Sequence, residues 1–384
     1  MTIRAIDEYT GFLAPGHLQR FHDELSISYG ALGVVMAMPY LGGLVSNVVL
    51  VRTDGTDRKR VCVGGAIVTA IAMLLIAFST GLVTLCAATL LFGVAVSCLV
   101  DGGEIVLANA TDGPLERILA RVNLGGTFGD LAGPLVIAGT RWLGVEWRWL
   151  FGATSIAIAV YAAVLSRQTF SPAREVEVEV EVDAPAPTSV LRHRAIWWLG
   201  VAALIGNPLD EPFLATLLAF VERDRAISGG AAQLLGAAFV VGGLSVYTVL
   251  VRHLEARHIS TVFMLAGLMM ATSAFATLFV PVWAIALVGL MHSTALNGQW
   301  LVLQAAALRV APGREGSAGA LIDTIELVSL VVPVAFGFVA QRHGLGWSIA
   351  CYSAWPLLYI VPAIGLRRER LGTKAVMPPP VADE

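Results

Sequence analysis

The chain has 384 residues, of which 57% are hydrophobic and 14% are charged, and its mean hydropathy is +0.75. Soluble globular proteins contain about 25% charged residues, so this chain has too little charge to cover a water-facing surface of its size. The composition excludes an ordinary soluble protein and indicates a lipid bilayer as the main surroundings. The net charge of −3 and the lack of a basic cluster with interleaved aromatic residues predict no nucleic-acid partner.

Apolar stretches of the length that crosses a bilayer, about 20 residues, recur along the whole chain. Eleven are clear and the first one is short. The predicted spans cover residues 5–21, 29–51, 61–79, 82–109, 118–140, 147–166, 195–221, 229–251, 259–280, 282–308, 316–341 and 345–366. We therefore expect an all-α membrane protein with 12 transmembrane helices, the first of them shortened.

The basic residues are distributed unevenly between the predicted loops. Loops that would share a side with the amino terminus hold 19 of the 25 Lys and Arg residues, and the loops on the other side hold six. Basic residues favour the cytoplasmic side of a membrane, so we expect both termini in the cytoplasm. The alanine- and arginine-rich composition is typical of a bacterial protein, which predicts the inner membrane as the location.

The stretch from 167 to 194 divides the chain into two similar halves. It contains alternating Glu and Val followed by Asp183-Ala184-Pro185, and it is predicted to be a solvated cytoplasmic linker. The flanking halves are expected to be six-helix bundles, residues 1–166 and 195–366, with a cytoplasmic tail at 367–384. Val49-Leu50-Val51-Arg52 repeats as Val249-Leu250-Val251-Arg252, which indicates an internal duplication.

Two adjacent carboxylate pairs, Asp7-Glu8 and Asp210-Glu211, lie within apolar sequence. A carboxylate in the membrane costs about 2.5–3.5 kcal/mol on insertion scales, so its presence in both halves favours a function in a central polar cavity. Pro208 and Pro212 flank the second pair and would bend that helix. Only six residues precede Asp7, whereas 15 residues from Ala195 onward precede Asp210, which is why the first helix looks shortened.

Further polar residues lie inside the predicted spans, and they make the interior acidic on balance. Asp101 and Glu104 share one helical face, as do Asp323 and Glu326. These residues are candidates to bind substrate or protons, with Asp101 and Glu104 as proton relays. The alternatives are that Asp323 and Glu326 bond to polar groups of neighbouring helices and that Asp101 lies near the cytoplasmic interface. The other candidates are Asp130, Asn297 and Gln299.

Six plus six spans, duplicated halves, an acidic linker and a basic loop after the second span resemble the major facilitator superfamily. Asp54, Arg58 and Arg60 are similar to the family's loop motif, although the spacing differs. The resemblance implies a gating loop; the alternative is a basic anchor at the cytoplasmic surface.

The fifth span resembles a motif of the family's antiporters. Gly125, Gly129 and Gly133 recur at every fourth residue and are followed by Pro134. Small residues at this spacing let helices approach closely, and proline kinks a helix. The resemblance implies export, and ordinary helix packing is the alternative.

Taken with the acidic interior, the resemblance implies a proton-coupled antiporter that exports a cationic or amphiphilic small molecule by alternating access. The alternatives are an importer of a small polar nutrient and a divalent-metal exporter, which would need ligands such as His17 or His292 near the carboxylates. Nothing in the sequence predicts an enzyme, a cofactor or a bound metal. We expect a monomer, because one such chain is sufficient for a complete pathway.

Overall fold

A computed structural model of the protein describes residues 2–52, 58–110, 115–169, 191–250, 258–310 and 315–369. Every regular element in these ranges is helical, which confirms the predicted all-α class. Loop Asp54 lies outside the described residues. Arg58 begins a helix, but its side chain and those of Asp101 and Glu104 are not described.

The first half of the chain forms six helical segments. The first segment consists of α1 (Thr2–Leu13), the 3-10 turn η1 (Pro15–His17) and α2 (Leu18–Leu25). The five helices that follow are α3 (Tyr29–Arg52), α4 (Arg58–Ala77), α5 (Leu82–Ala110), α6 (Leu115–Trp142) and α7 (Trp147–Arg167).

Six more segments follow the linker, and several of them change helix type along their length. The seventh consists of α8 (Arg194–Gly206), the 3-10 turn η3 (Asn207–Leu209) and α9 (Glu211–Arg223). The eighth to tenth are α10 (Gly229–Ser245) with the π-helical turn η4 (Val246–Leu250), α12 (Ile259–Ala276) and α13 (Val282–Val310). The last two are α14 (Glu315–Glu326), η5 (Leu327–Leu330) and α15 (Val331–His343), then α16 (Leu345–Ala354), η6 (Trp355–Tyr359) and α17 (Ile360–Arg368).

The described segments have the surface of a membrane protein. Nine of them meet the length and hydropathy of a membrane span. Large apolar side chains such as Phe78, Val83, Trp149 and Ile156 are exposed on them. Soluble proteins rarely expose contiguous apolar surface on this scale, whereas lipid-facing helices must. The structure therefore agrees with a multi-pass membrane protein of about 12 helices.

The first segment is longer than the predicted span of 5–21, since it continues to Leu25. The prediction stopped at the polar residues after Phe21, but these residues satisfy one another along the helix. Arg20 lies 3.2 Å from Glu24, and Gln19 donates to Asp23 at 3.0 Å. Such pairs at i and i+4 support a helix in polar surroundings, so charge alone does not end it.

The helices group into two compact units that do not follow the order of the chain. Unit 1 contains Met1–Val182, Glu211–Val240 and Leu330–Ser348, and unit 2 contains Asp183–Asp210, Val241–Ser329 and Ile349–Glu384. Two of the boundaries coincide with interruptions of the α-helix, where η3 meets α9 and where η5 meets α15. A 3-10 turn breaks the regular helix, so α9 and α15 pack in unit 1 while α8 and α14 pack in unit 2. The predicted division into halves remains a prediction.

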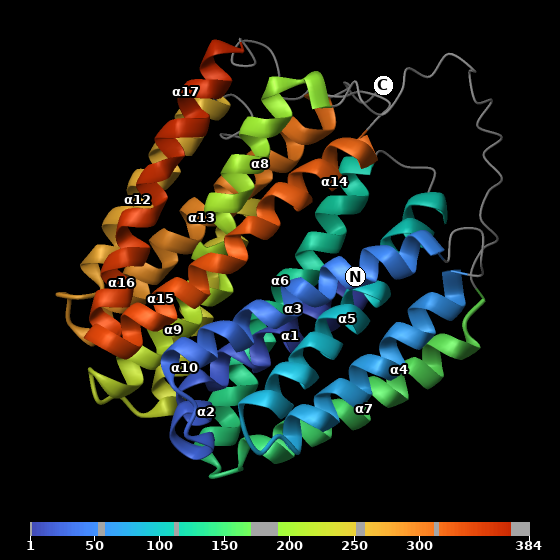
Figure 1. The fold of residues 1–384 in the computed structure, drawn as a ribbon, viewed down its shortest axis with the longest axis vertical. Helices are drawn as coiled ribbons and strands as arrows, with labels where there is room; N and C mark the ends of the chain where they lie inside the picture. The colour runs from blue at the N-terminus through green and yellow to red at the C-terminus, as the bar shows by residue number, and fades with distance from the viewer. Residues whose placement is uncertain are drawn as a thin grey trace. The chain divides into compact units, whose positions relative to one another are not determined.

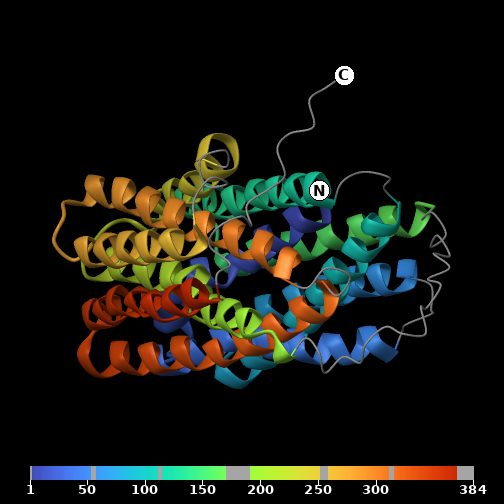
Figure 2. The same ribbon diagram turned by 90° about the horizontal axis from the view of Figure 1, so that it is seen from above.

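Within unit 1, α4 packs against both α5 and α7, and α3 packs against α5 and α15. Figure 1 shows α4 and α7 running side by side, and they remain adjacent in the view from above (Figure 2). The helix α1 lies against α6, and α2 and η1 contact α9. In unit 2, α8 packs against α14, and α12 packs against α13 and α17.

Candidate functional site

The first acidic pair is neutralised in part by a basic residue of its own helix. Arg4 contacts Asp7 at 2.8 Å and Glu8 at 3.1 Å, and the two carboxylates are 18% and 24% exposed. One cation shared by two carboxylates leaves a net charge of −1. The Asp7-Glu8 pair is therefore an ion-paired cluster with Arg4 in α1.

Glycines of α6, the fifth span, allow this cluster to pack closely against that helix. A Cβ atom at Gly126 would lie 3.1 Å from Arg4 Cγ and 3.2 Å from Glu8 Cγ, and one at Gly129 would collide with the backbone carbonyl of Ala5. Gly133 faces Phe12 in the same way. The predicted glycine stripe thus packs α6 against α1. Gly125 is buried, and Pro134 lies inside α6.

The second acidic pair lies directly after the break in the seventh segment. Asp210 directly follows η3 in unit 2 and is exposed, whereas Glu211 begins α9 in unit 1 and is half-buried. Glu211 Oε1 lies 3.0 Å from the position that a Cβ atom on Gly11 would occupy. Gly11 therefore lets the carboxylate approach the backbone of α1.

Glu211 also lines a narrow apolar cavity within unit 1. Phe21, Leu32, Met73 and Phe92 form part of its wall, and its volume of about 40 Å³ is enough for a water molecule. Glu211 is the one ionisable carboxylate among the residues that line it. A carboxylate in such surroundings exerts a strong attraction on a proton or a cation, because the apolar wall screens its charge poorly.

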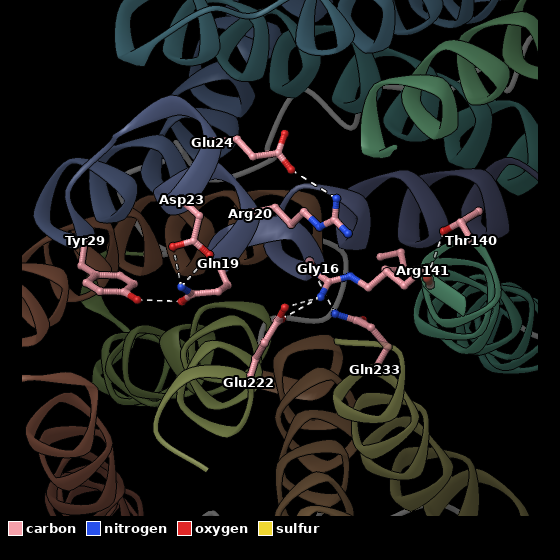
Figure 3. A network of polar contacts seen from close by, with 11 residues as sticks. Gly16, Gln19, Arg20, Asp23, Glu24, Tyr29, Thr140, Arg141, Glu222 and Gln233 are labelled. Atoms are coloured by element: carbon pink, nitrogen blue, oxygen red, sulfur yellow. Dashed lines mark hydrogen bonds and ion pairs between the residues drawn. The ribbon is translucent and has the colours of Figure 1, made fainter. Parts of the chain in front are cut away.

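The seventh and eighth segments are joined to the fifth and the first by partly buried polar contacts that the sequence did not predict. Arg141, at the end of α6, binds both carboxylate oxygens of Glu222 in α9 at 2.6 and 2.7 Å, and it donates to the carbonyl of Gly16 at 3.3 Å. Gln233 in α10 donates to the same carbonyl at 2.8 Å. We call these four residues the Arg141 cluster; Figure 3 shows how they converge.

Neighbouring contacts extend this connection along α2. Tyr29 donates to Gln19 at 2.7 Å, and the guanidinium of Arg223 lies 5.4 Å from the centre of the Tyr29 ring (Figure 3 shows the tyrosine). Trp147 donates to Glu24 at 2.6 Å. The sequence offered one signal for these contacts, namely single charged residues at the ends of apolar segments, but it could not pair residues 81 positions apart.

The acids of α14 lie in different surroundings from those of α1. Asp323 is exposed and Glu326 is half-buried, and neither has an ion pair or hydrogen bond with another residue in the described ranges. Asp130 is half-buried in α6 and has interaction partners. Arg60 is exposed on α4.

The polar residues of α13 lie inside unit 2. Asn297 accepts a hydrogen bond from Tyr247 at 3.3 Å and donates to the carbonyl of Ser293 at 3.0 Å. Gln299 is fully buried. His292 contacts Ser273 at 3.2 Å and the carbonyl of Leu209 at 3.2 Å.

The possible metal ligands are not grouped. His17 is buried and bonds to the carbonyl of Leu13 at 2.7 Å. Among the residues that the structure describes, no three His, Cys, Asp or Glu side chains lie close enough to hold a metal ion. The metal-exporter alternative therefore gains no support from this geometry.

Comparisons with known proteins identify a family and a fold. The family model described as Major Facilitator Superfamily matches residues 9–332. No curated sequence matches this chain. The similar solved structures include a bacterial homologue of the human lysosomal transporter Spinster in an inward-facing, unoccupied conformation, the nucleoside transporter NupG, and a D-xylose–proton symporter.

The similarity to each of these structures extends over almost the whole chain. The Spinster homologue has a TM-score of 0.74 at 14% identity, with 96% of both chains covered. NupG has 0.74 at 12%, covering 96% of this chain and 98% of its own. The symporter has 0.73 at 14%, covering 94% and 95%. At such low identity the likeness shows the shared fold alone.

Proposed function

The chain belongs to the Major Facilitator Superfamily, and from this membership we propose that it is a proton-coupled antiporter that exports a cationic or amphiphilic small molecule by alternating access. The family and the similar structures indicate a secondary transporter rather than an enzyme. We further propose the bacterial inner membrane as its location, with both termini in the cytoplasm. The uneven distribution of basic residues supports this orientation, and a single chain is proposed to act as a monomer.

One observation carries the proposal of a cationic substrate. The predicted spans after residue 195 contain the carboxylates of Asp210, Glu211, Asp323 and Glu326, while their Lys and Arg residues lie only at or beyond the span ends. An interior with surplus negative charge attracts cations and repels anions. Close carboxylates also hold protons more readily than isolated ones do.

Antiport follows from competition for these carboxylates. A cationic substrate that binds Glu211 from the cytoplasm would displace a proton, and a proton arriving from the other side would displace the substrate. Each exchange replaces one cation by another, so the carboxylate is never left charged and unpaired in apolar surroundings. The glycine stripe of α6, which resembles an antiporter motif, supports the same direction.

Alternating access requires contacts that form in one state and break in another. The Arg141 cluster supplies suitable contacts, because it joins η1 and α6 to α9 and α10 through the Arg141–Glu222 ion pair and the hydrogen bonds to the Gly16 carbonyl, with Arg141 only 6% exposed. We propose that it closes the non-cytoplasmic side of the pathway.

The experiment that tests this function is a measurement of proton movement in everted membrane vesicles with a pH-sensitive dye. Lipophilic cations, polyamines and divalent metals are added in turn to vesicles that contain wild type, Glu211→Gln or the control Glu146→Gln. Glu146 is exposed and precedes α7. We expect proton release in wild type and the control, and at least a tenfold smaller release in Glu211→Gln.

If no compound of the panel causes proton release from wild-type vesicles, the proposal of cation export is contradicted. Uptake of a neutral or anionic solute by the same vesicles would then support the importer. Equal proton release in wild type and Glu211→Gln would support antiport but contradict a role of Glu211 in binding.

A further inference from the structure

Three segments of unit 2 contain a 3-10 turn, and these turns are joined by hydrogen bonds. The 3-10 turns are η3, η5 and η6. Asn207 in η3 donates to Ser329 in η5 at 2.9 Å, and Trp355 in η6 donates to the carbonyl of Ile205, just before η3, at 2.9 Å. Irregular backbone at membrane depth occurs where it is buried in protein or lines a water-filled space.

Two polar side chains are buried beside these turns without a partner. Gln299 of α13 is 0% exposed and Tyr359 of η6 is 1% exposed. Neither amide atom of Gln299 nor the hydroxyl of Tyr359 has a hydrogen-bond partner among the described residues. A buried polar group left in this way costs about 1–3 kcal/mol, which is why such groups in native proteins usually bind ordered water.

Gly206 brings the two unpartnered groups together. A Cβ atom on Gly206 would lie 2.6 Å from the Tyr359 hydroxyl and 2.8 Å from Gln299 Nε2. Both polar groups therefore lie next to Gly206, the last residue of α8 before η3, where no side chain separates them. They offer a donor and an acceptor to a ligand of the size of water.

Glu326 is the last residue of α14 and directly precedes η5, whose Ser329 accepts the hydrogen bond from Asn207, the residue after Gly206. Asp323 lies one turn earlier on the same helix. Among the described side chains of the helices packed against α14, the basic groups are Arg194 at the start of α8 and His292 of α13, which bonds to Ser273 and Leu209; the side chain of Arg309, near the end of α13, is not described. Of the side chains that the structure describes, the titratable groups near Glu326 are thus an acid, Asp323, and a phenol, Tyr359.

We propose that Gln299 and Tyr359 bind a water molecule beside Glu326 and that this site conducts the coupling proton to and from the Glu326 carboxylate. The inference rests on the proposed proton coupling, and it separates the proton-binding acid in unit 2 from the substrate-binding acid Glu211 in unit 1. In the loading step, a hydronium ion held by Gln299 and Tyr359 transfers one proton to the Glu326 carboxylate, which becomes a neutral carboxylic acid. Water and an unchanged Tyr359 remain.

The test uses N,N′-dicyclohexylcarbodiimide, an apolar reagent that reacts with protonated carboxyl groups in apolar surroundings. The full chain is reconstituted in liposomes without substrate, and labelling of Glu326 is followed by peptide mass spectrometry from pH 5 to 9. We expect labelling that decreases as the pH rises. No labelling of Glu326 at any pH in this range would overturn the proposal.

Variants then test the role of the buried pair. Tyr359→Phe removes only the hydroxyl, and Gly206→Ala places a methyl group between the two polar side chains. Both should shift the midpoint of Glu326 labelling upward by about one pH unit, since the carboxylate loses the proposed water molecule as its hydrogen-bond donor. The matched control is Gly319→Ala in α14, where an added Cβ meets nothing within 4 Å; its midpoint should equal that of wild type.

Unchanged midpoints in both variants would also overturn the proposal. If Tyr359→Phe aggregates on size-exclusion chromatography, Gly206→Ala and the wild-type profile still decide the question. The outcome is separable from that of the vesicle assay. Shifted midpoints without substrate-driven proton release would support the proton site but contradict the proposed antiport. Substrate-driven release in Glu326→Gln that equals wild type would contradict the proton site alone.

Discussion

Unit 1 and unit 2 treat their charged residues differently. The ion pairs of Arg4 with Asp7 and Glu8, of Arg20 with Glu24, and of Arg141 with Glu222 lie in unit 1. Asp323 and Glu326 of unit 2 have no such partner among the described residues. A carboxylate held by an arginine stays ionised and contributes to structure, whereas one without a base is free to exchange protons. The difference teaches that the position of an acid within the membrane does not by itself indicate a role in transport.

The largest expected effect comes from breaking the most buried pair of unit 1. Arg141→Ala leaves Glu222 without its cation, and removal of one partner of a buried ion pair costs about 3–5 kcal/mol. We expect the contacts between η1, α6, α9 and α10 to open. In a background without the four native cysteines, Thr10→Cys, which is 1% exposed in the wild-type structure, should react at least tenfold faster with a water-soluble maleimide.

The charge-reversed double variant Arg141→Glu with Glu222→Arg is the control for that experiment. It restores an ion pair between the same two helices, so labelling should return toward the wild-type rate. Labelling that stays slow in Arg141→Ala would contradict a role of the cluster in closing unit 1.

A second experiment makes unit 2 resemble unit 1. Ala320 is exposed on α14, one turn before Asp323, just as Arg4 lies one turn before Asp7. Ala320→Arg should pair with Asp323 and lower the tendency of the α14 acids to hold a proton. We expect the carbodiimide labelling midpoint of Glu326 to move to lower pH.

The matched substitution Ala320→Gln adds a side chain of similar length without charge. If it moved the midpoint as much as Ala320→Arg does, the effect would be steric and the comparison of the two units by charge would fail.

The smallest expected effect comes from making unit 1 resemble unit 2. Arg4→Leu removes the cation from Asp7 and Glu8, which are partly exposed, so the loss of stability should be only about 1 kcal/mol. A thermal-shift assay in detergent measures it. The more informative result is chemical: Asp7 or Glu8 should become reactive toward the carbodiimide, while both remain unreactive in wild type.

Arg4→Lys retains the charge and serves as the control, with wild-type reactivity expected. Carbodiimide labelling of Asp7 or Glu8 in wild type, at a rate similar to that of Glu326, would show that the arginine does not distinguish the two sites.

The sequence predicted most of the helices, because a run of about 20 apolar residues has few other solutions in a membrane. Boundaries failed where polar residues pair along a helix, as Arg20 and Glu24 do. The glycines of α6 were recognised by their spacing, but their contact with α1, and the contribution of Gly126, became visible only when the helices were packed.

Correspondence between the halves also needed the structure. The sequence aligned Asp7-Glu8 with Asp210-Glu211. The helical parts before the two breaks have nearly equal lengths, 12 residues in α1 and 13 in α8. Asp7 and Glu8 lie well before the first break, whereas Asp210 and Glu211 directly follow the second, so the two pairs occupy different places along their segments.

Taken by itself, the sequence determined the all-α membrane class, the approximate spans and the family, since each depends on local apolar length or on order along the chain. Only the tertiary structure decided which carboxylates have a base, that Arg141 meets Glu222, and that Gln299 and Tyr359 share a site over Gly206. These relations join residues far apart in the chain. Burial and pairing depend on distances between helices, and a linear pattern of residues does not contain those distances.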